Sequence, residues 1–275
     1  MVGFARERDV AIRLAIEASQ FIREASRGGF ECSEKGRGDL VTSADLGADA
    51  LLRAGLRSDF PEDALLTEES GWVEGSGDRV WIIDPLDGTK AFARGEPGSC
   101  VHVALHAAGA LQLGVVADPF GERVAWAVAG EGAWESDEAG GRRVRLERGG
   151  DGSSTPRLVV SRSMSPERRA ALMSACGWSG GAQVRGAGYK TLTICRGEGD
   201  VYFSEHPLHV WDTAAPSMIA LEAGASISTL QGARWDLPLG SPWRHRDLMV
   251  VTAGVDHASA VSRLQSAWSG LSSEA

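Results

Sequence analysis

Apolar residues follow two different spacings along this chain. Near the N-terminus, Val10, Leu14 and Phe21 recur at helical spacing with isoleucines at 12, 16 and 22, which predicts an amphipathic helix over residues 5–27, ended by two glycines. A second helix is predicted over about residues 45–58. After it come short apolar runs: ALLT, VWII, VHVALHA, LQLGVVADP and RVAWAVAG. Glycine, proline or aspartate separates these runs, so they predict strands and turns.

The second half of the chain alternates between the two patterns. RLVVSRS, SPERRAALMSAC, GDVYF and WDTAAPSMIALEAGA predict strand, helix, strand and helix in that order. Strands and helices interleaved in this way predict a layered α/β architecture. The polar, glycine-rich stretch GGDGSSTP at 149–156 is the weakest join, so we expect an N-terminal lobe over residues 1–148 and a C-terminal lobe over residues 149–275.

Composition and charge narrow the classes of function. The 275 residues are 43% hydrophobic and 24% charged, which indicates a folded globular protein. The net charge of −9 argues against a nucleic-acid partner. A small anionic substrate would need bound cations to offset the negative charge around it. The four cysteines form no CxxC pair, and neither a signal peptide nor a run of 18 apolar residues is present. We therefore expect a soluble cytoplasmic protein with no membrane partner.

The stretch WIIDPLDGTK, residues 81–90, places two carboxylates three positions apart at the end of a buried strand. Proline ends the strand at Asp84-Pro85, and Asp87-Gly88-Thr89 predicts a turn into a helix. Both aspartates could simply be turn formers. Alternatively Asp84, Asp87 and the Leu86 carbonyl are hard oxygen ligands suited to Mg²⁺. Phosphatases with an aspartate nucleophile also carry a DxDGT motif, but there the carboxylates stand two apart and close to the chain start.

Further carboxylates follow other strands and precede other helices. Glu68 and Glu69 follow the run ALLT, where a solvated acidic loop is the plain alternative and only one of the two could face the same site. Asp45 and Asp212 each stand near a predicted helix start, where capping is the ordinary explanation. The combination favours a cation site over the separate explanations.

Four motifs in this order give the chain a family resemblance. DLVTSAD, TEES, WIIDPLDGT and WDTAA resemble the inositol monophosphatase-like superfamily of magnesium-dependent, lithium-sensitive phosphatases, from residue 10 to about residue 255. The resemblance implies a five-layered αβαβα sandwich, two or three Mg²⁺ ions per site, inhibition by Li⁺ and a small phosphomonoester as partner. It leaves a monomer and a homodimer both open.

The resemblance also implies a role for each matching residue. The implied metal ligands are Glu68, Asp84, the Leu86 carbonyl, Asp87 and Asp212. Asp45 and Thr89 match the pair that orients and deprotonates the attacking water, with Glu68 beside them in the catalytic set. This agrees with physical expectation, because a threonine hydroxyl is too weak an acid to act without a carboxylate partner. Two cations about 4 Å apart can hold the nucleophilic water and the departing oxygen on opposite sides of phosphorus. The implied substrate contacts are Gly88, Thr89, Lys90, Ser161, Arg162 and Lys190.

Within the superfamily, the motifs favour 3′(2′),5′-bisphosphate nucleotidases. DGTK at 87–90, and GAGYK at 186–190 followed by WDTAAP, resemble the nucleotidase motifs, which predicts hydrolysis of 3′-phosphoadenosine 5′-phosphate to AMP. Lys190 could offset the second phosphate, although an exposed lysine is the alternative. Met164, Ala91 and Ala187 depart from the nucleotidase pattern, so an inositol, sugar or histidinol phosphate remains the second substrate class. A non-catalytic nucleotide sensor is the remaining hypothesis, which the complete reactive set disfavours.

Overall fold

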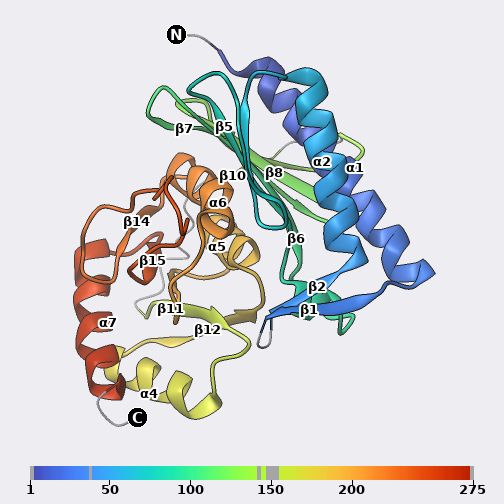
Figure 1. Cartoon of the computed structure of the whole chain (residues 1–275). Coiled ribbons are helices and arrows are strands. Elements are labelled where there is room, and N and C mark those ends of the chain that lie inside the picture. Colours follow the sequence, from blue (N-terminus) through green and yellow to red (C-terminus); the bar gives the residue numbers. More distant parts are fainter. Residues whose placement is uncertain (1–2, 37–38, 141–143, 147–154, 273–275) are drawn as a thin grey trace.

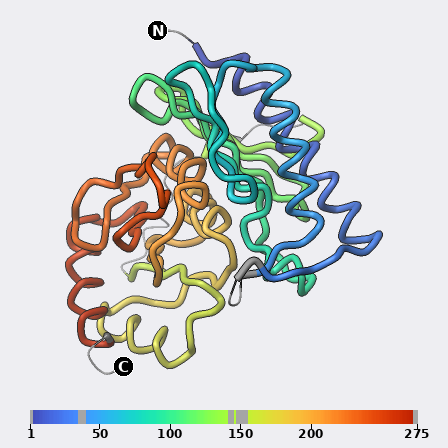
Figure 2. Tube along the Cα trace, in the orientation of Figure 1, coloured from blue at the N-terminus to red at the C-terminus, as the bar shows by residue number. Residues whose placement is uncertain are grey.

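The computed structural model describes residues 3–36, 39–140, 144–146 and 155–272. The expected join between the two lobes at 148 and 149 lies outside these residues, so that boundary stays a prediction. The chain completes one large sheet before it begins a smaller one, and the two halves lie side by side (Figure 2).

The large sheet has eight strands in the order β10-β9-β8-β7-β6-β5-β3-β4. Only the β3 and β5 pair is parallel; the other neighbours are antiparallel. Each apolar run predicted in the N-terminal half of the chain forms a strand of this sheet. The strands are β3 Ala64–Thr67, β4 Gly71–Val73, β5 Val80–Asp87, β6 Cys100–Ala107, β7 Ala110–Asp118, β8 Arg123–Val128, β9 Gly132–Asp137 and β10 Val144–Leu146.

The smaller sheet has five strands in the order β12-β11-β13-β15-β14, and a two-stranded ribbon precedes both sheets. The five strands are β11 Arg157–Ser161, β12 Ser179–Val184, β13 Val201–Phe203, β14 Ser226–Thr229 and β15 Met249–Thr252. The ribbon pairs β1 Cys32–Gly36 with β2 Asp39–Thr42 in antiparallel fashion.

Seven helices complete the described chain. They are α1 Ala5–Gly28, α2 Ser43–Asp59, α3 Thr89–Phe92, α4 Pro166–Cys176, α5 Ala187–Cys195, α6 Val210–Glu222 and α7 His257–Ser272. The first helix agrees with the prediction, and the second begins two residues earlier than expected because Thr42, not a later residue, caps it.

The helices and sheets stack in five layers (Figure 1). Helices α1 and α2 pack on the outer face of the large sheet. Helices α5 and α6 lie between the two sheets, and α4 and α7 cover the outer face of the small sheet. The predicted αβαβα sandwich is confirmed. Strand β5 is buried along its whole length because helices cover both faces of its sheet, which explains its unbroken apolar run.

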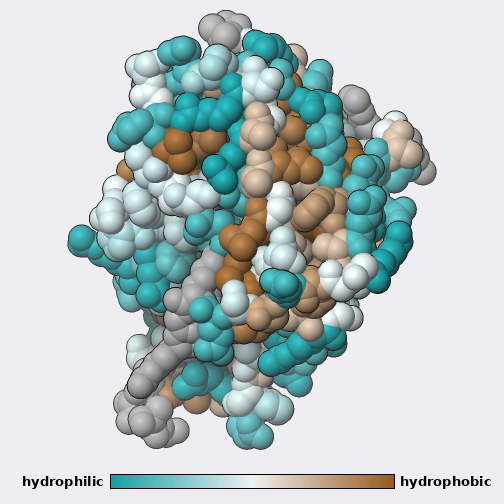
Figure 3. All heavy atoms as spheres, turned by 45° about the vertical axis from the view of Figure 1, so that its right-hand side comes forward, coloured by the Kyte–Doolittle hydropathy of each residue, from teal (hydrophilic) through white to brown (hydrophobic). Residues whose placement is uncertain are grey.

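The surface mixes hydrophilic and apolar side chains. The turned view in Figure 3 shows apolar residues reaching the surface along the middle of one face, between hydrophilic margins. Among the described residues, the large apolar side chains that are most exposed are Leu46, Phe120 and Leu221. None of them identifies a partner copy, so the homodimer stays a prediction.

Candidate active site

Three carboxylates from two distant segments of the chain meet where β5 ends and α6 begins. Ligand atoms of Asp84, Asp87 and Asp212 all lie within 4.8 Å of one another. They line a pocket of about 240 Å³, which Glu68, Leu86, Gly88, Thr89, Lys90 and Leu40 also line. The structure therefore brings together every metal ligand that the resemblance implies; that they bind metal stays a prediction.

A bulge in β5 turns both of its aspartates toward this pocket. The register between β5 and β6 is interrupted between Asp84 and Asp87, because Pro85 cannot donate to the ladder. The Leu86 N–H donates instead to Asp84 Oδ1 at 3.0 Å. The local turn that the sequence suggested around Asp84 and Pro85 thus holds the Asp84 carboxylate in place.

Asp45 and Asp212 do serve helix starts, but not as the cap residues themselves. Each is the third residue of its helix and accepts a hydrogen bond from the N–H of the cap residue, Thr42 at 2.8 Å and His209 at 2.6 Å. This reciprocal arrangement stabilises the first turn and fixes the carboxylate. Capping and a role in the site are therefore compatible for both residues.

Thr89 and Asp45 form the pair that the resemblance implies. The Thr89 hydroxyl donates to Asp45 Oδ1 at 2.8 Å and lies 3.2 Å from the Leu86 carbonyl. Burial raises the pKa of Asp45, with hydrogen bonds from Thr42 and Thr89 opposing the shift. A carboxylate with a raised pKa is a stronger base for a proton that comes through the threonine hydroxyl.

The GAGYK segment supports Asp87 from the other half of the chain. The Gly188 N–H donates to Asp87 Oδ2 at 2.9 Å. Gly186 has a φ of +71°, and an added Cβ there would lie 2.8 Å from the same oxygen. The sequence motif places these glycines with the substrate-selecting residues and gives no sign of this contact, which joins distant parts of the chain.

The electrostatics of the cluster call for a cation. Burial raises the pKa of Asp84 well above its usual range, and the charges of Glu68, Asp87 and Asp212 add to the shift. Burial and the charge of Asp87 likewise raise the pKa of Asp212 to about 7. Asp84 Oδ2 is buried and accepts no hydrogen bond from the described residues. An all-oxygen, anionic donor set with such an orphaned atom fits a hard divalent cation.

The two glutamates after β3 differ in position. Glu68 lines the pocket and acts on the pKa of Asp84, whereas Glu69 is absent from the described lining. Both glutamates follow β3, which ends at Thr67. Their different positions relative to the pocket therefore arise in the turn after the strand and not from the alternation of side chains along a strand. The preference for Glu68 agrees with this geometry.

The predicted substrate residues of the second half divide into two groups. Lys190 is only 8% exposed, so the alternative of an exposed lysine is wrong. Burial lowers its pKa, while the charges of Asp87, Asp212 and Glu205 oppose the shift. Its Nζ lies 5.1 Å from the centre of the Tyr202 ring.

Ser161 and Arg162 lie at the end of β11, outside the described lining of the acidic pocket. The Ser161 hydroxyl is 2.7 Å from the Ser163 hydroxyl, and the Arg162 guanidinium is 3.8 Å from Glu96. The structure does not bring them into the carboxylate cluster, and their contact with substrate stays a prediction.

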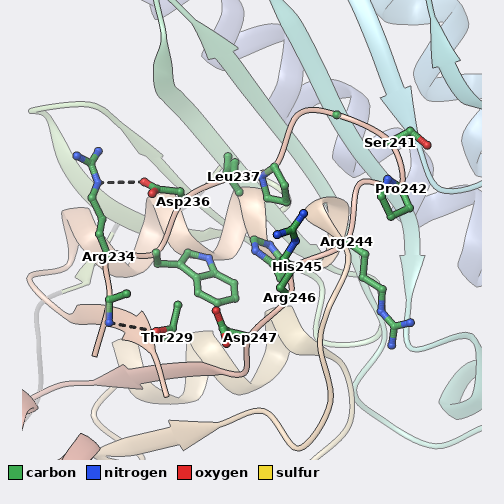
Figure 4. A pocket seen from close by; sticks show the side chains of 14 residues that line it. Thr229, Arg234, Asp236, Leu237, Ser241, Pro242, Arg244, His245, Arg246 and Asp247 are labelled. Atoms are coloured by element: carbon green, nitrogen blue, oxygen red, sulfur yellow. Dashed lines mark hydrogen bonds and ion pairs between the residues drawn. The ribbon is translucent and has the colours of Figure 1, made fainter. Parts of the chain in front are cut away.

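A second pocket, of about 420 Å³, is lined by the loop over residues 229–247. Figure 4 shows the guanidinium groups of Arg234 and Arg244 on opposite sides of it, and Arg234 pairs with Asp236 at 3.2 Å. The charges of these two arginines therefore do not converge on one ligand position. The loop instead supports α6, because His245 Nε2 and the Thr213 hydroxyl are 2.8 Å apart.

Within the described residues, no helix combines the length and apolar character needed to cross a membrane.

Comparison with known proteins agrees with this fold. The profile of the inositol monophosphatase family matches residues 5–267. The Nus factor SuhB of Pasteurella multocida strain Pm70 is 32% identical over 249 residues, which covers 84% of this chain and 88% of that protein. The 3′(2′),5′-bisphosphate nucleotidase CysQ of Salmonella typhimurium strain LT2 is 32% identical over 229 residues, with 82% and 91% covered.

A solved structure of similar fold is described as an IMPase/NADP phosphatase complexed with Mg²⁺ and phosphate. It shares 20% identity, covers 94% of this chain and 95% of its own, and superposes with a TM-score of 0.76. The predictions of cytoplasmic location and of no nucleic-acid partner are not decided by these relatives. Because the family profile spans nearly the whole chain and two curated relatives share about a third of their residues with it, this protein belongs to the inositol monophosphatase family.

Proposed function

We propose that this protein is a Mg²⁺-dependent phosphomonoesterase. The observation that carries the proposal is the convergence of Asp84, Asp87 and Asp212 beside the hydrogen-bonded pair of Thr89 and Asp45. Glu68, Asp84, the Leu86 carbonyl, Asp87 and Asp212 would hold the ions. Bound Mg²⁺ would neutralise the charge of the phosphate and of the carboxylates and would lower the pKa of a water molecule.

The residues of this chain supply the proton path and the positioning. Thr89 accepts a proton from the attacking water as it passes its own hydroxyl proton to Asp45. The water oxygen forms a bond to phosphorus while the bond between phosphorus and the ester oxygen breaks. The departing oxygen takes a proton from solvent, so inorganic phosphate and an alcohol are released. Gly88, Thr89 and Lys90, at the start of α3, would contact the transferred phosphate.

We propose 3′-phosphoadenosine 5′-phosphate as the leading substrate. Support comes from Lys190, a buried ammonium group on α5, the helix whose Gly188 N–H donates to Asp87. A cation there can meet the second phosphate of a bisphosphate substrate. Ser161 and Arg162 are proposed to contact the remainder of the nucleotide.

One observation favours the second substrate class, a polyol or sugar monophosphate. The charge of Glu205 acts on Lys190, and the charge of Lys190 acts on Glu205. A carboxylate whose charge acts on this ammonium group partly cancels its positive charge and so weakens its attraction for a second phosphate. Inositol 1-phosphate is the simplest test of this alternative.

Phosphate release in the presence of Mg²⁺ tests the proposal. The substrates to compare at equal concentration are 3′-phosphoadenosine 5′-phosphate, AMP, inositol 1-phosphate and histidinol phosphate. Preference for the bisphosphate supports the whole proposal, and preference for inositol 1-phosphate corrects the substrate alone. Asp84→Asn should lose activity by orders of magnitude while remaining folded. Silence on all four substrates, or unchanged turnover in Asp84→Asn, would contradict the catalytic assignment.

A further inference from the structure

His102 lies directly behind the carboxylate cluster, on the strand next to β5. In the register of β5 and β6 it stands opposite Asp84, and neighbours across two strands share a face of the sheet. It is fully buried, and its own face of β6 also carries Cys100 and Ala104, which belong to the core between the two sheets. Its ring therefore points away from α1 and α2 and toward the elements that carry the rest of the site.

The ring lies near two of the carboxylates and near the backbone carbonyl that precedes the third. Nδ1 lies 3.3 Å from the Trp211 carbonyl oxygen and 4.0 Å from Asp84 Oδ2. Nε2 lies 3.4 Å from Asp87 Oδ2. Because a carbonyl can only accept, the Nδ1–H must be the donor to Trp211. Trp211 precedes Asp212 in the first turn of α6, so this bond joins that turn to β6.

The His102 ring has room because residue 188 is a glycine. A Cβ at Gly188 would lie 2.1 Å from His102 Nε2, far inside the contact distance. The same glycine donates its N–H to Asp87 Oδ2. The ring thus fills the corner between β6, α5 and α6, beside the Asp87 carboxylate that α5 holds through Gly188.

We propose that His102 is a positioning residue that holds Asp87 and Asp212 at the separation that a divalent cation requires. It acts through its hydrogen bond to the Trp211 carbonyl and through the packing of its ring edge against Asp87, not as a ligand itself. The inference rests on the proposed cation site and extends it to a residue outside that site. Supports of this kind behind metal ligands typically change metal affinity about 10- to 100-fold when they are removed.

The test compares two side chains of equal shape at position 102. Asparagine places an amide N–H near the position of Nδ1, whereas leucine has the same branching and no donor. Mg²⁺ affinity is measured by titration calorimetry on the full-length wild type, His102→Asn and His102→Leu. We expect His102→Leu to bind Mg²⁺ about 10- to 100-fold more weakly, and His102→Asn to stay within about threefold of wild type.

The possible outcomes separate the inference from the proposed function. Equal affinity in all three proteins, or equal weakening in both variants, would overturn the positioning role while the cation site stands. Absence of Mg²⁺ binding by the wild type would overturn both. The Mg²⁺ dependence of activity is a second readout. The loss in His102→Leu should be relieved by raising the Mg²⁺ concentration, whereas a loss of folded protein would not be relieved.

A second variant covers the case in which leucine prevents folding. Gly188→Ala introduces the Cβ that clashes with the ring, so we expect it to weaken Mg²⁺ binding. In the double variant with His102→Ala the clash is gone, and the added methyl should cost no further affinity. Additive losses in that cycle would show that Gly188 acts independently of His102 and would contradict the proposal.

Discussion

Asp84→Asn should make the protein more stable without Mg²⁺ and unable to gain stability from Mg²⁺. The substitution keeps the shape of a fully buried side chain and removes its charge. Like charges 4.8 Å apart repel by about 3.5 kcal/mol at an effective dielectric constant of ~20. For 275 residues with an unfolding entropy of ~2.1 cal/mol/K each, this corresponds to a rise in Tm of roughly 6 °C at pH 8.

The assay is thermal unfolding at pH 8, with EDTA and with saturating Mg²⁺. Wild type at a Mg²⁺ concentration 100 times Kd gains about 2.7 kcal/mol, and Asp84→Asn should gain almost nothing. Asp63→Asn is the matched control, because the Asp63 carboxylate is also buried but accepts hydrogen bonds from Arg79 and Trp81. That variant should lose stability and keep the Mg²⁺ response. A lower Tm for Asp84→Asn in EDTA, or an intact Mg²⁺ gain, would refute the reasoning.

Three further predictions follow from the same site. Thr89→Ala should lower kcat by about 10²-fold or more, and Thr89→Ser should recover most of the rate because it restores the hydroxyl donor to Asp45; equal rates for the two variants would contradict the proton path. Lys190→Met should lower kcat/KM for 3′-phosphoadenosine 5′-phosphate by about 10- to 100-fold and leave inositol 1-phosphate hydrolysis unchanged, because a charged hydrogen bond contributes roughly 1.5–3 kcal/mol. Equal effects on both substrates would show that Lys190 does not recognise a second phosphate. In EDTA the free energy of unfolding should fall as pH rises from about 4 to about 7, because folded Asp212, with a pKa of about 7, keeps a proton that the unfolded chain has lost. Urea unfolding measured across this pH range should show a smaller decline in Asp212→Asn, and a smaller decline in the wild type with saturating Mg²⁺. An unchanged decline in either case would contradict Asp212 as its origin.

The sequence predicted the elements well because their signals are local. Apolar runs such as VWII identify strands buried on both faces, and Gly28 and Gly29 mark the end of the first helix. The carboxylate set was also predicted, but through the resemblance, since spacing along the chain does not show that Asp212 lies beside Asp84. That proximity depends on how α6 packs against β5.

The parts that could not be predicted depend on tertiary contacts. The burial of Lys190 follows from the position of α5 between two sheets, and a lysine in a polar motif gives no sign of it. The link between Gly188 and Asp87 joins residues 101 positions apart. His102 sits within an ordinary apolar run, VHVALHA, and only the register with Asp84 shows that it faces the cluster.

The central position of α6 limits how this protein can change. Gly114 of β7 has no room for a side chain, because a Cβ there would lie 2.5 Å from the Ala215 carbonyl oxygen of α6. A helix held this closely cannot shift to suit a new substrate without moving Asp212. Variation in specificity is therefore expected in peripheral segments, such as the loop over residues 229–247 and the end of β11, while the carboxylate cluster stays fixed to the core.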